Sequence, residues 1–204
     1  MNVVLASNNA GKLAELTALL APLGVSLTAQ TELGIGEVEE TATSFVENAL
    51  IKARHAAAAS GRPTIADDSG LVVAGLGGAP GVRSARYAGS PSDATANNRK
   101  LIDAMGGITD RRAYFYCALV FMRDAGDPAP LIATATWKGL VVDVPAGSGG
   151  FGYDPHFLVD GLNRTAAELS APLKNQISHR GKAAAALVGS IRHALEDIRR
   201  SGTA

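Results

Sequence analysis

The stretch ASNNAGKLAEL, residues 6–16, decides the fold class of this chain. It follows the apolar run Val-Val-Leu at residues 3–5, which is typical of a short buried strand. Leucines then recur at residues 13, 16, 19, 20 and 23, the spacing of one helical face, and Gly24 is suited to end that helix. The stretch is therefore predicted to be the turn between a strand, residues 2–6, and a helix, residues 12–23.

Strands and helices continue to alternate along the chain. Ser44 and Glu47 have the spacing of a capping box, so a helix is predicted to begin there. Two long apolar runs, residues 113–122 and 131–138, flank a turn-rich segment and predict an antiparallel hairpin. The other elements are predicted as strands at residues 25–29 and 64–66, the latter continuing at 71–74, and as helices at 44–59, 92–105 and 180–200. Together they indicate an α/β fold, with a mixed central β-sheet, flanking helices and a long antiparallel hairpin, in one domain over residues 1–204.

Composition limits the partners and the location. The 204 residues include 19 basic and 19 acidic side chains, a balance that argues against a nucleic acid or a membrane surface bound through bulk charge. The single cysteine, Cys117, lies in an apolar run and is expected to be a buried reduced thiol. Because the chain shows neither a targeting segment nor about 20 consecutive apolar residues, we expect a cytoplasmic protein.

The first strand-to-helix turn is suited to bind phosphate. Exposed N–H groups at a helix N-terminus attract anions, and Lys12 adds a full positive charge. The turn is not a Walker loop, because Leu13 follows the lysine where serine or threonine is required. An ordinary capped turn with a solvated lysine is the alternative interpretation.

Two acidic pairs, Glu39-Glu40 and Asp67-Asp68, are predicted at a loop and at a strand end. Adjacent carboxylates repel each other unless a cation offsets their charge, and Mg²⁺ binds one or two carboxylates together with phosphate oxygens and waters. An unperturbed carboxyl has a pKa near ~4, so either aspartate could accept a proton from water at neutral pH. For the glutamates, a solvated loop pair is an equal alternative.

Two further segments are candidates for contacts with a planar base. Phe151 and Tyr153 lie in a glycine-rich loop, and stacking of an aromatic ring on a base contributes about 1–3 kcal/mol. Lys174, His179 and Arg180 supply hydrogen-bond donors near the last helix. The alternatives are a packed turn with Phe151 in the core and a solvated helix start.

Six segments together closely resemble the inosine triphosphate pyrophosphatase family: SNNAGK at residues 7–12, SFVENA at 44–49, ADDSG at 66–70, PGVRSARYAG at 80–89, GFGYDP at 150–155 and SHRG at 178–181. The resemblance spans nearly the whole chain. It implies an ITPase-like fold and Mg²⁺-dependent hydrolysis of deaminated purine nucleoside triphosphates (ITP, dITP, XTP) to the nucleoside monophosphate and pyrophosphate. It also implies a homodimer.

The resemblance also implies roles for individual residues. Asp68 is the expected general base, and Glu40 and Asp68 are the expected metal ligands, although the residues alone leave Asp67 open as the base. The expected contacts to substrate are Ser7, Asn8, Asn9, Ala10, Gly11 and Lys12 at the triphosphate, Ser69 at the nucleotide, and Phe151, Gly152, Tyr153, Asp154, Lys174, His179 and Arg180 at the base.

Two residues depart from the family pattern. Asn8 stands where glycine is common, and asparagine tolerates a positive φ better than most residues. His156 stands where an aliphatic residue is usual. Two other functions stay open on this reasoning: a related pyrophosphatase for modified pyrimidine or methylated nucleotides, and a nucleotide-binding module without turnover.

Overall fold

The strands form one mixed six-stranded sheet in the order β2-β1-β3-β4-β5-β6 in this computed structural model, which describes residues 2–201. The side chains of Leu23 and of residues 192–201 lie outside that description. The strands are β1 Asn2–Ala6, β2 Ser26–Ala29, β3 Thr64–Val73, β4 Arg112–Met122, β5 Leu131–Val141 and β6 Phe157–Val159. β1 pairs in parallel with β2 and β3, and β5 pairs antiparallel with β6, so the predicted mixed sheet is confirmed.

β4 and β5 are neighbours in the sheet, connected only by residues 123–130. This connection is too short for a parallel crossover, which takes a dozen or more residues, so the two strands form the predicted hairpin. No helix within residues 2–201 is both long and apolar enough to span a bilayer.

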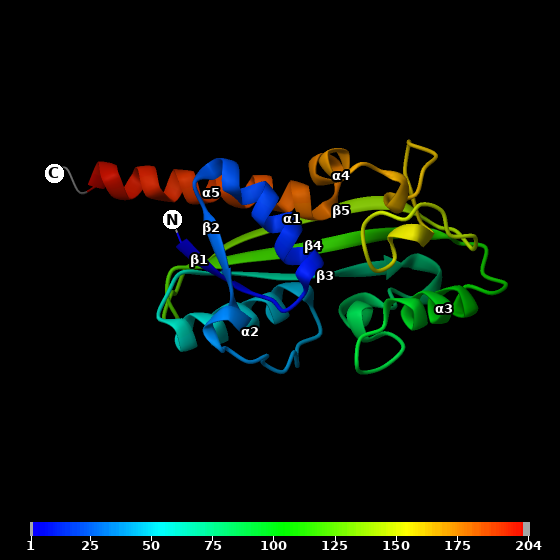
Figure 1. Ribbon diagram of the computed structural model, residues 1–204, viewed down its shortest axis with the longest axis horizontal. Coiled ribbons are helices and arrows are strands. Elements are labelled where there is room, and N and C mark those ends of the chain that lie inside the picture. Colours follow the sequence, from blue (N-terminus) through cyan, green and yellow to red (C-terminus); the bar gives the residue numbers. More distant parts are fainter. Residues whose placement is uncertain (1, 202–204) are drawn as a thin grey trace. The chain divides into compact units, whose positions relative to one another are not determined.

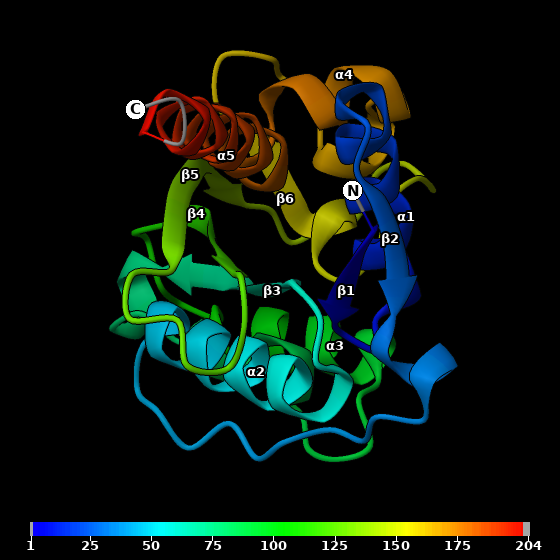
Figure 2. The same ribbon diagram turned by 90° about the vertical axis from the view of Figure 1, so that its left-hand side faces the viewer.

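Two compact units share the long strands. Unit 1 comprises Met1–Asp68, Ala118–Thr134 and Arg180–Ala204, and unit 2 comprises Ser69–Cys117 and Ala135–His179. In unit 1, helices α1 (Ala10–Leu20) and α5 (His179–Ser201) cover one face of the sheet and α2 (Phe45–Ser60) covers the other (Figures 1 and 2). The unit 1 core is aliphatic, with these fully buried side chains: Val3, Leu5, Leu16, Leu20, Ala53 and Ile65.

Side-chain caps fix where the helices of unit 1 begin. Asn9 caps α1 by accepting a hydrogen bond from the Lys12 N–H at 3.0 Å, so this helix begins two residues before the predicted start. Ser44 caps α2 by accepting from the Glu47 N–H at 3.3 Å, and its hydroxyl donates to the Glu47 carboxylate at 2.6 Å. The predicted start of α2 is confirmed.

Unit 2 has an aromatic core and two helices, α3 (Ala94–Ala104) and α4 (Ala171–Ile177). The ring centroids of Phe115 and Phe157 are 4.6 Å apart. Asp93 rather than the predicted Ser92 caps α3, since the Asp93 carboxylate accepts two backbone N–H groups. α4 was not among the predicted elements.

β3 runs unbroken through the acidic pair, so the prediction that Asp67 and Asp68 end a strand is wrong. The sequence Ser-Gly at residues 69–70 favours a turn, yet Gly70 is a strand residue here. A Cβ at Gly70 would lie 2.3 Å from the Ser84 Oγ, so glycine allows a close approach of two segments within unit 2. The Ser84 Oγ also accepts a hydrogen bond from the Leu71 N–H at 2.8 Å.

Candidate functional site

The two adjacent aspartates of β3 lie on opposite faces of the sheet, because successive side chains of a strand alternate. Asp67 is fully buried between the Lys12 ammonium, at 2.6 Å, and the Arg180 Nε, at 2.8 Å. Arg180 also pairs with Glu15. Burial opposes ionisation of Asp67, but the charges of Arg180 and Lys12 outweigh it and hold the pKa well below its usual range. Asp67 is therefore a fixed counter-ion for two cations.

Asp68 faces α2 and has a different environment. The Lys52 ammonium lies 2.7 Å from the Asp68 Oδ1 and 3.1 Å from the Glu40 Oε1. The Asp68 Oδ2 is buried and has no hydrogen-bond partner among the residues that the structure describes. Burial raises the pKa of Asp68, and the attraction of Lys52 offsets only part of that effect. Asp68 thus has an oxygen available for a ligand or a proton.

Glu40, Lys52 and Asp68 form a candidate cation site in unit 1. One ammonium reaches both carboxylates, and the exposed Glu39 has no part in the arrangement. Within residues 2–201 no group of three or more His, Cys, Asp or Glu side chains is gathered as a metal cage. Two carboxylates with an unpaired oxygen still match Mg²⁺, which takes one or two protein carboxylates and completes its shell with phosphate and water.

Residues 7–12 form a turn held by side-chain amides. The Asn8 Nδ2 donates to the Glu37 carboxylate at 2.9 Å, and the Asn8 Oδ1 accepts from the Gln30 Nε2 at 2.8 Å. The Ser7 hydroxyl accepts from the Asn9 N–H at 3.2 Å. Among the described residues Asn163 is the one non-glycine residue with a positive φ, so the turn forms without the positive φ considered for Asn8.

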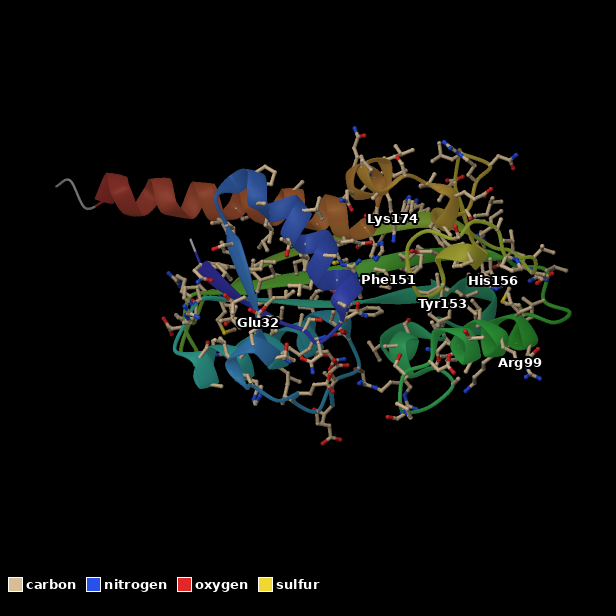
Figure 3. The ribbon with its side chains drawn as sticks, viewed as in Figure 1. Glu32, Arg99, Phe151, Tyr153, His156 and Lys174 are labelled. Carbon is tan, nitrogen blue, oxygen red and sulfur yellow. The ribbon has the colours of Figure 1, made fainter. Side chains whose placement is uncertain are left out.

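In unit 2 the glycine-rich loop surrounds a buried ion pair. The Asp154 Oδ2 accepts from the Phe151 N–H at 2.9 Å and from the Lys174 ammonium at 2.6 Å. The Lys174 Nζ lies 4.9 Å from the centre of the Phe151 ring, a cation–π distance (Figure 3). A Cβ at Gly150 would lie 2.0 Å from the Asp154 Oδ2, so only glycine fits there.

Two other predicted base contacts are buried in unit 2. The Tyr153 hydroxyl donates to the Ser84 carbonyl at 2.8 Å, and burial raises the pKa of this phenol. The His179 ring stacks on Phe115 at 4.8 Å and lies 6.2 Å from Trp137. The side chains of Tyr153 and His179 are therefore packed against protein groups.

The predicted site residues fall into three groups. Unit 1 brings Lys12, Asp67 and Arg180 together on one face of the sheet and Glu40 with Asp68 on the other, whereas unit 2 gathers Phe151, Asp154 and Lys174 around its loop. Unit 2 also contains Ser69, Gly152, Tyr153 and His179, and unit 1 contains the turn of residues 7–12. The roles of all these residues in catalysis and binding stay predictions.

Lys52 is the candidate residue that the sequence analysis missed. It lies in an alanine-rich helix where a lysine is ordinarily solvated. A signal exists in its spacing, since Lys52 follows the buried Ala49 by three residues and precedes the buried Ala56 by four. That places the lysine on the inward stripe of α2. Burial lowers the pKa of Lys52, but the charges of Asp68 and Glu40 outweigh it and raise the pKa.

Comparisons with known proteins agree with this architecture. A sequence model described as the Ham1 family matches residues 3–190, a range that includes parts of both units. Proteins named dITP/XTP pyrophosphatase from Nitrosomonas europaea and Ralstonia nicotianae are 58% and 56% identical over 91% and 93% of this chain, and over 92% and 96% of their own. The solved structure of a HAM1 protein from Coxiella burnetii has a TM-score of 0.87 and 46% identity, covering 95% of this chain and 99% of that one. The predicted family is thereby confirmed, and this chain belongs to the Ham1 family.

Proposed function

We propose that this protein hydrolyses the deaminated purine nucleoside triphosphates ITP, dITP and XTP to the nucleoside monophosphate and pyrophosphate. Family membership and the names of relatives at 58% and 56% identity support the reaction. The observation that carries a catalytic rather than a purely binding role is Asp68, a buried carboxylate with one unpaired oxygen.

Asp68 is the general base in this proposal. Water adds to the α-phosphorus, and the bond between that phosphorus and the oxygen of the pyrophosphate leaving group breaks. One proton of the water passes to the Asp68 Oδ2. A raised pKa makes Asp68 a stronger base than an ordinary carboxylate. Lys52 holds the other oxygen at 2.7 Å and so orients the carboxylate. Asp67 is a poor base, because two cations stabilise its charge.

Glu40 and Asp68 are the proposed ligands of a divalent cation, with Mg²⁺ as the expected ion. When bound, such an ion offsets the charge of phosphate oxygens and polarises the attacking water. The Asp68 and Glu40 carboxylates supply hard oxygen ligands. Lys52 would keep the two carboxylates from repelling each other before the ion arrives.

The turn of residues 7–12 is the proposed triphosphate site of unit 1. Backbone N–H groups at the start of α1 and the positive end of that helix favour an anion. Asn9 and Ala10 are exposed, so a ligand can reach them. Asp67 holds the Lys12 ammonium at 2.6 Å, which limits the side chain to one position beside the turn.

Base recognition is proposed for unit 2 residues and Arg180. Lys174 is a donor for a purine oxo group, and Phe151 offers a ring for stacking. Adenine carries an amino group where hypoxanthine carries the 6-oxo group, so ATP would leave buried donors unpaired. Ser69, Gly152, Tyr153, Asp154 and His179 complete the proposed surroundings, with the packed side chains acting as a rigid support.

Steady-state rates with Mg²⁺ on ITP, XTP, GTP, ATP and dUTP test this proposal. We expect kcat/KM for ITP and XTP to exceed that for ATP by at least about a hundredfold. Asp68→Asn should lower turnover on ITP by about 10²–10⁴-fold. Asp103→Asn is the matched control, because Asp103 is an exposed carboxylate whose pairing with Arg99 spans 3.9 Å. Preference for dUTP or ATP, or an active Asp68→Asn variant, would overturn the proposal.

A homodimer and a cytoplasmic location, both expected from the sequence, stay predictions. Tyr114 and Leu140 are large apolar side chains that unit 2 leaves exposed, and such side chains suit a subunit contact. Light scattering of the purified protein at several concentrations measures the oligomeric state.

A further inference from the structure

The glycine-rich loop of unit 2 depends on neighbouring groups for its conformation. Gly147, Gly150 and Gly152 all have φ between 63° and 78°, where glycine has little intrinsic preference. The Asp154 carboxylate fixes the Phe151 N–H, as described above. The peptide between Gly152 and Tyr153, two positions further along the loop, needs an anchor of its own.

Asn98 of α3 supplies that anchor. The Asn98 Nδ2 donates to the Gly152 carbonyl at 2.9 Å across 54 positions of sequence. The Asn98 Oδ1 is buried and has no hydrogen-bond partner among the described residues. The side chain thus makes one hydrogen bond at the expense of an unpaired acceptor, a poor arrangement for stability alone.

The neighbouring Asn97 provides a contrast. The Asn97 Oδ1 accepts from the Ala88 N–H at 2.6 Å, and the Asn97 Nδ2 donates to the Ala85 carbonyl at 2.9 Å. Both hydrogen-bonding groups of this buried amide are used, as is usual for a structural asparagine. Asn98 differs because the one hydrogen bond of its side chain among the described residues goes to the candidate base loop.

Fixing the Gly152 carbonyl also fixes the next N–H group. The carbonyl of Gly152 and the N–H of Tyr153 belong to one planar peptide and point in opposite directions across a trans bond. With the carbonyl held towards Asn98, the Tyr153 N–H points away from it. This N–H has no hydrogen-bond partner within the part of the chain that the structure describes. It is a backbone donor held in a set direction.

We propose that Asn98 is a positioning residue for base selection, which orients the Gly152–Tyr153 peptide so that the Tyr153 N–H donates to an oxo group of the purine. The inference rests on the proposed function, since it assumes that the base binds at this loop. Asn98 itself does not touch the substrate. A base with an amino group in place of the oxo group would place a second hydrogen-bond donor opposite the Tyr153 N–H.

Kinetics of Asn98→Asp and Asn98→Ala test the inference. Aspartate has nearly the shape of asparagine but cannot donate, and its charge repels the Gly152 carbonyl, whereas alanine leaves that carbonyl without a partner. Arg99→Ala is the matched control, because Arg99 is the next residue of α3 and its side chain is 85% exposed. Each variant is assayed beside the wild type on ITP and ATP, and its thermal midpoint is recorded.

We expect both Asn98 variants to raise KM for ITP by about tenfold or more, with kcat little changed, because a base contact far from the reacting phosphorus contributes uniform binding. The ratio of kcat/KM for ITP over ATP should fall by a similar factor, and Arg99→Ala should match the wild type. If the aspartate variant does not fold, the alanine variant decides.

Two results overturn the inference in distinguishable ways. If the wild type acts on ITP and the Asn98 variants keep its KM and its ratio of kcat/KM for ITP over ATP, the positioning role alone is removed. The positioning role is likewise removed if the variants lower the thermal midpoint and reduce kcat/KM for ITP and for ATP by the same factor. A wild type inactive on ITP removes the proposed function and this inference together.

Discussion

Replacing Asp67 and Asp68 separately by asparagine should affect stability in very different ways. Asp67 is fully buried between two cations, and removing one partner of a buried ion pair ordinarily costs about 3–5 kcal/mol. Asp67→Asn should lie at the lower end, about 3 kcal/mol, because Arg180 keeps Glu15 and the Lys12 side chain is 13% exposed.

Asp68→Asn should change the free energy of unfolding by no more than about 1 kcal/mol. Lys52 keeps Glu40 at 3.1 Å after the substitution. Burial also penalises the Asp68 charge, and a neutral amide removes that penalty. The two adjacent, isosteric substitutions thus separate a structural carboxylate from one with a proposed role in the reaction.

Urea unfolding at pH 7, followed by circular dichroism, measures both variants against the wild type. The slope of the transition should stay constant, so that midpoints report stability directly. Equal destabilisation by the two substitutions would refute the assignment of Asp67 as counter-ion and Asp68 as reactive group. So would an Asp67→Asn variant within about 1 kcal/mol of the wild type.

Three further outcomes are expected. The pKa of Asp67 is lower in the folded chain than its usual value near 3.9; its stabilisation is therefore complete above that pH and lost below it, so urea midpoints of wild type and Asp67→Asn should converge from about pH 4 downward, and a constant gap would contradict this. His156→Ile removes a 2.9 Å contact between the His156 Nδ1 and the Val142 carbonyl, and should cost about 1 kcal/mol in unfolding while leaving ITP turnover at neutral pH largely intact; a hundredfold fall in kcat would refute that view. Ser44→Ala removes the α2 cap and should lower the free energy of unfolding by about 1 kcal/mol in a thermal or urea melt. An unchanged melt would show that α2 does not depend on the hydrogen bond from the Glu47 N–H to Ser44.

Local signals in the sequence predicted the elements whose cause is local. The Ser44 and Glu47 capping pair located the start of α2, and leucine spacing located α1. The α3 start was misassigned by one or two residues because Ser92 and Asp93 are both good caps, and only the fold selects between them. α4 was missed because its seven residues are too few for a clear helical periodicity.

Features that depend on distant packing were not accessible from the sequence. The strand was predicted to end at the acidic pair, whereas β3 continues through Gly70, where the lack of a side chain admits Ser84 at close range. Lys52 was not singled out, although it bridges Glu40 and Asp68. The residues of the candidate site were expected from the resemblance, whereas the separation of Asp67 from Asp68 required knowing that both lie within one continuous strand.

The identity of the products released from ITP tests the proposed function most directly. Phosphorus NMR of ITP with the wild-type protein and Mg²⁺ distinguishes the two possible cleavages in one spectrum. The proposed reaction yields equal amounts of IMP and pyrophosphate, and we expect neither product from Asp68→Asn at comparable times. Orthophosphate with IDP, or products that persist unchanged in Asp68→Asn, would contradict it.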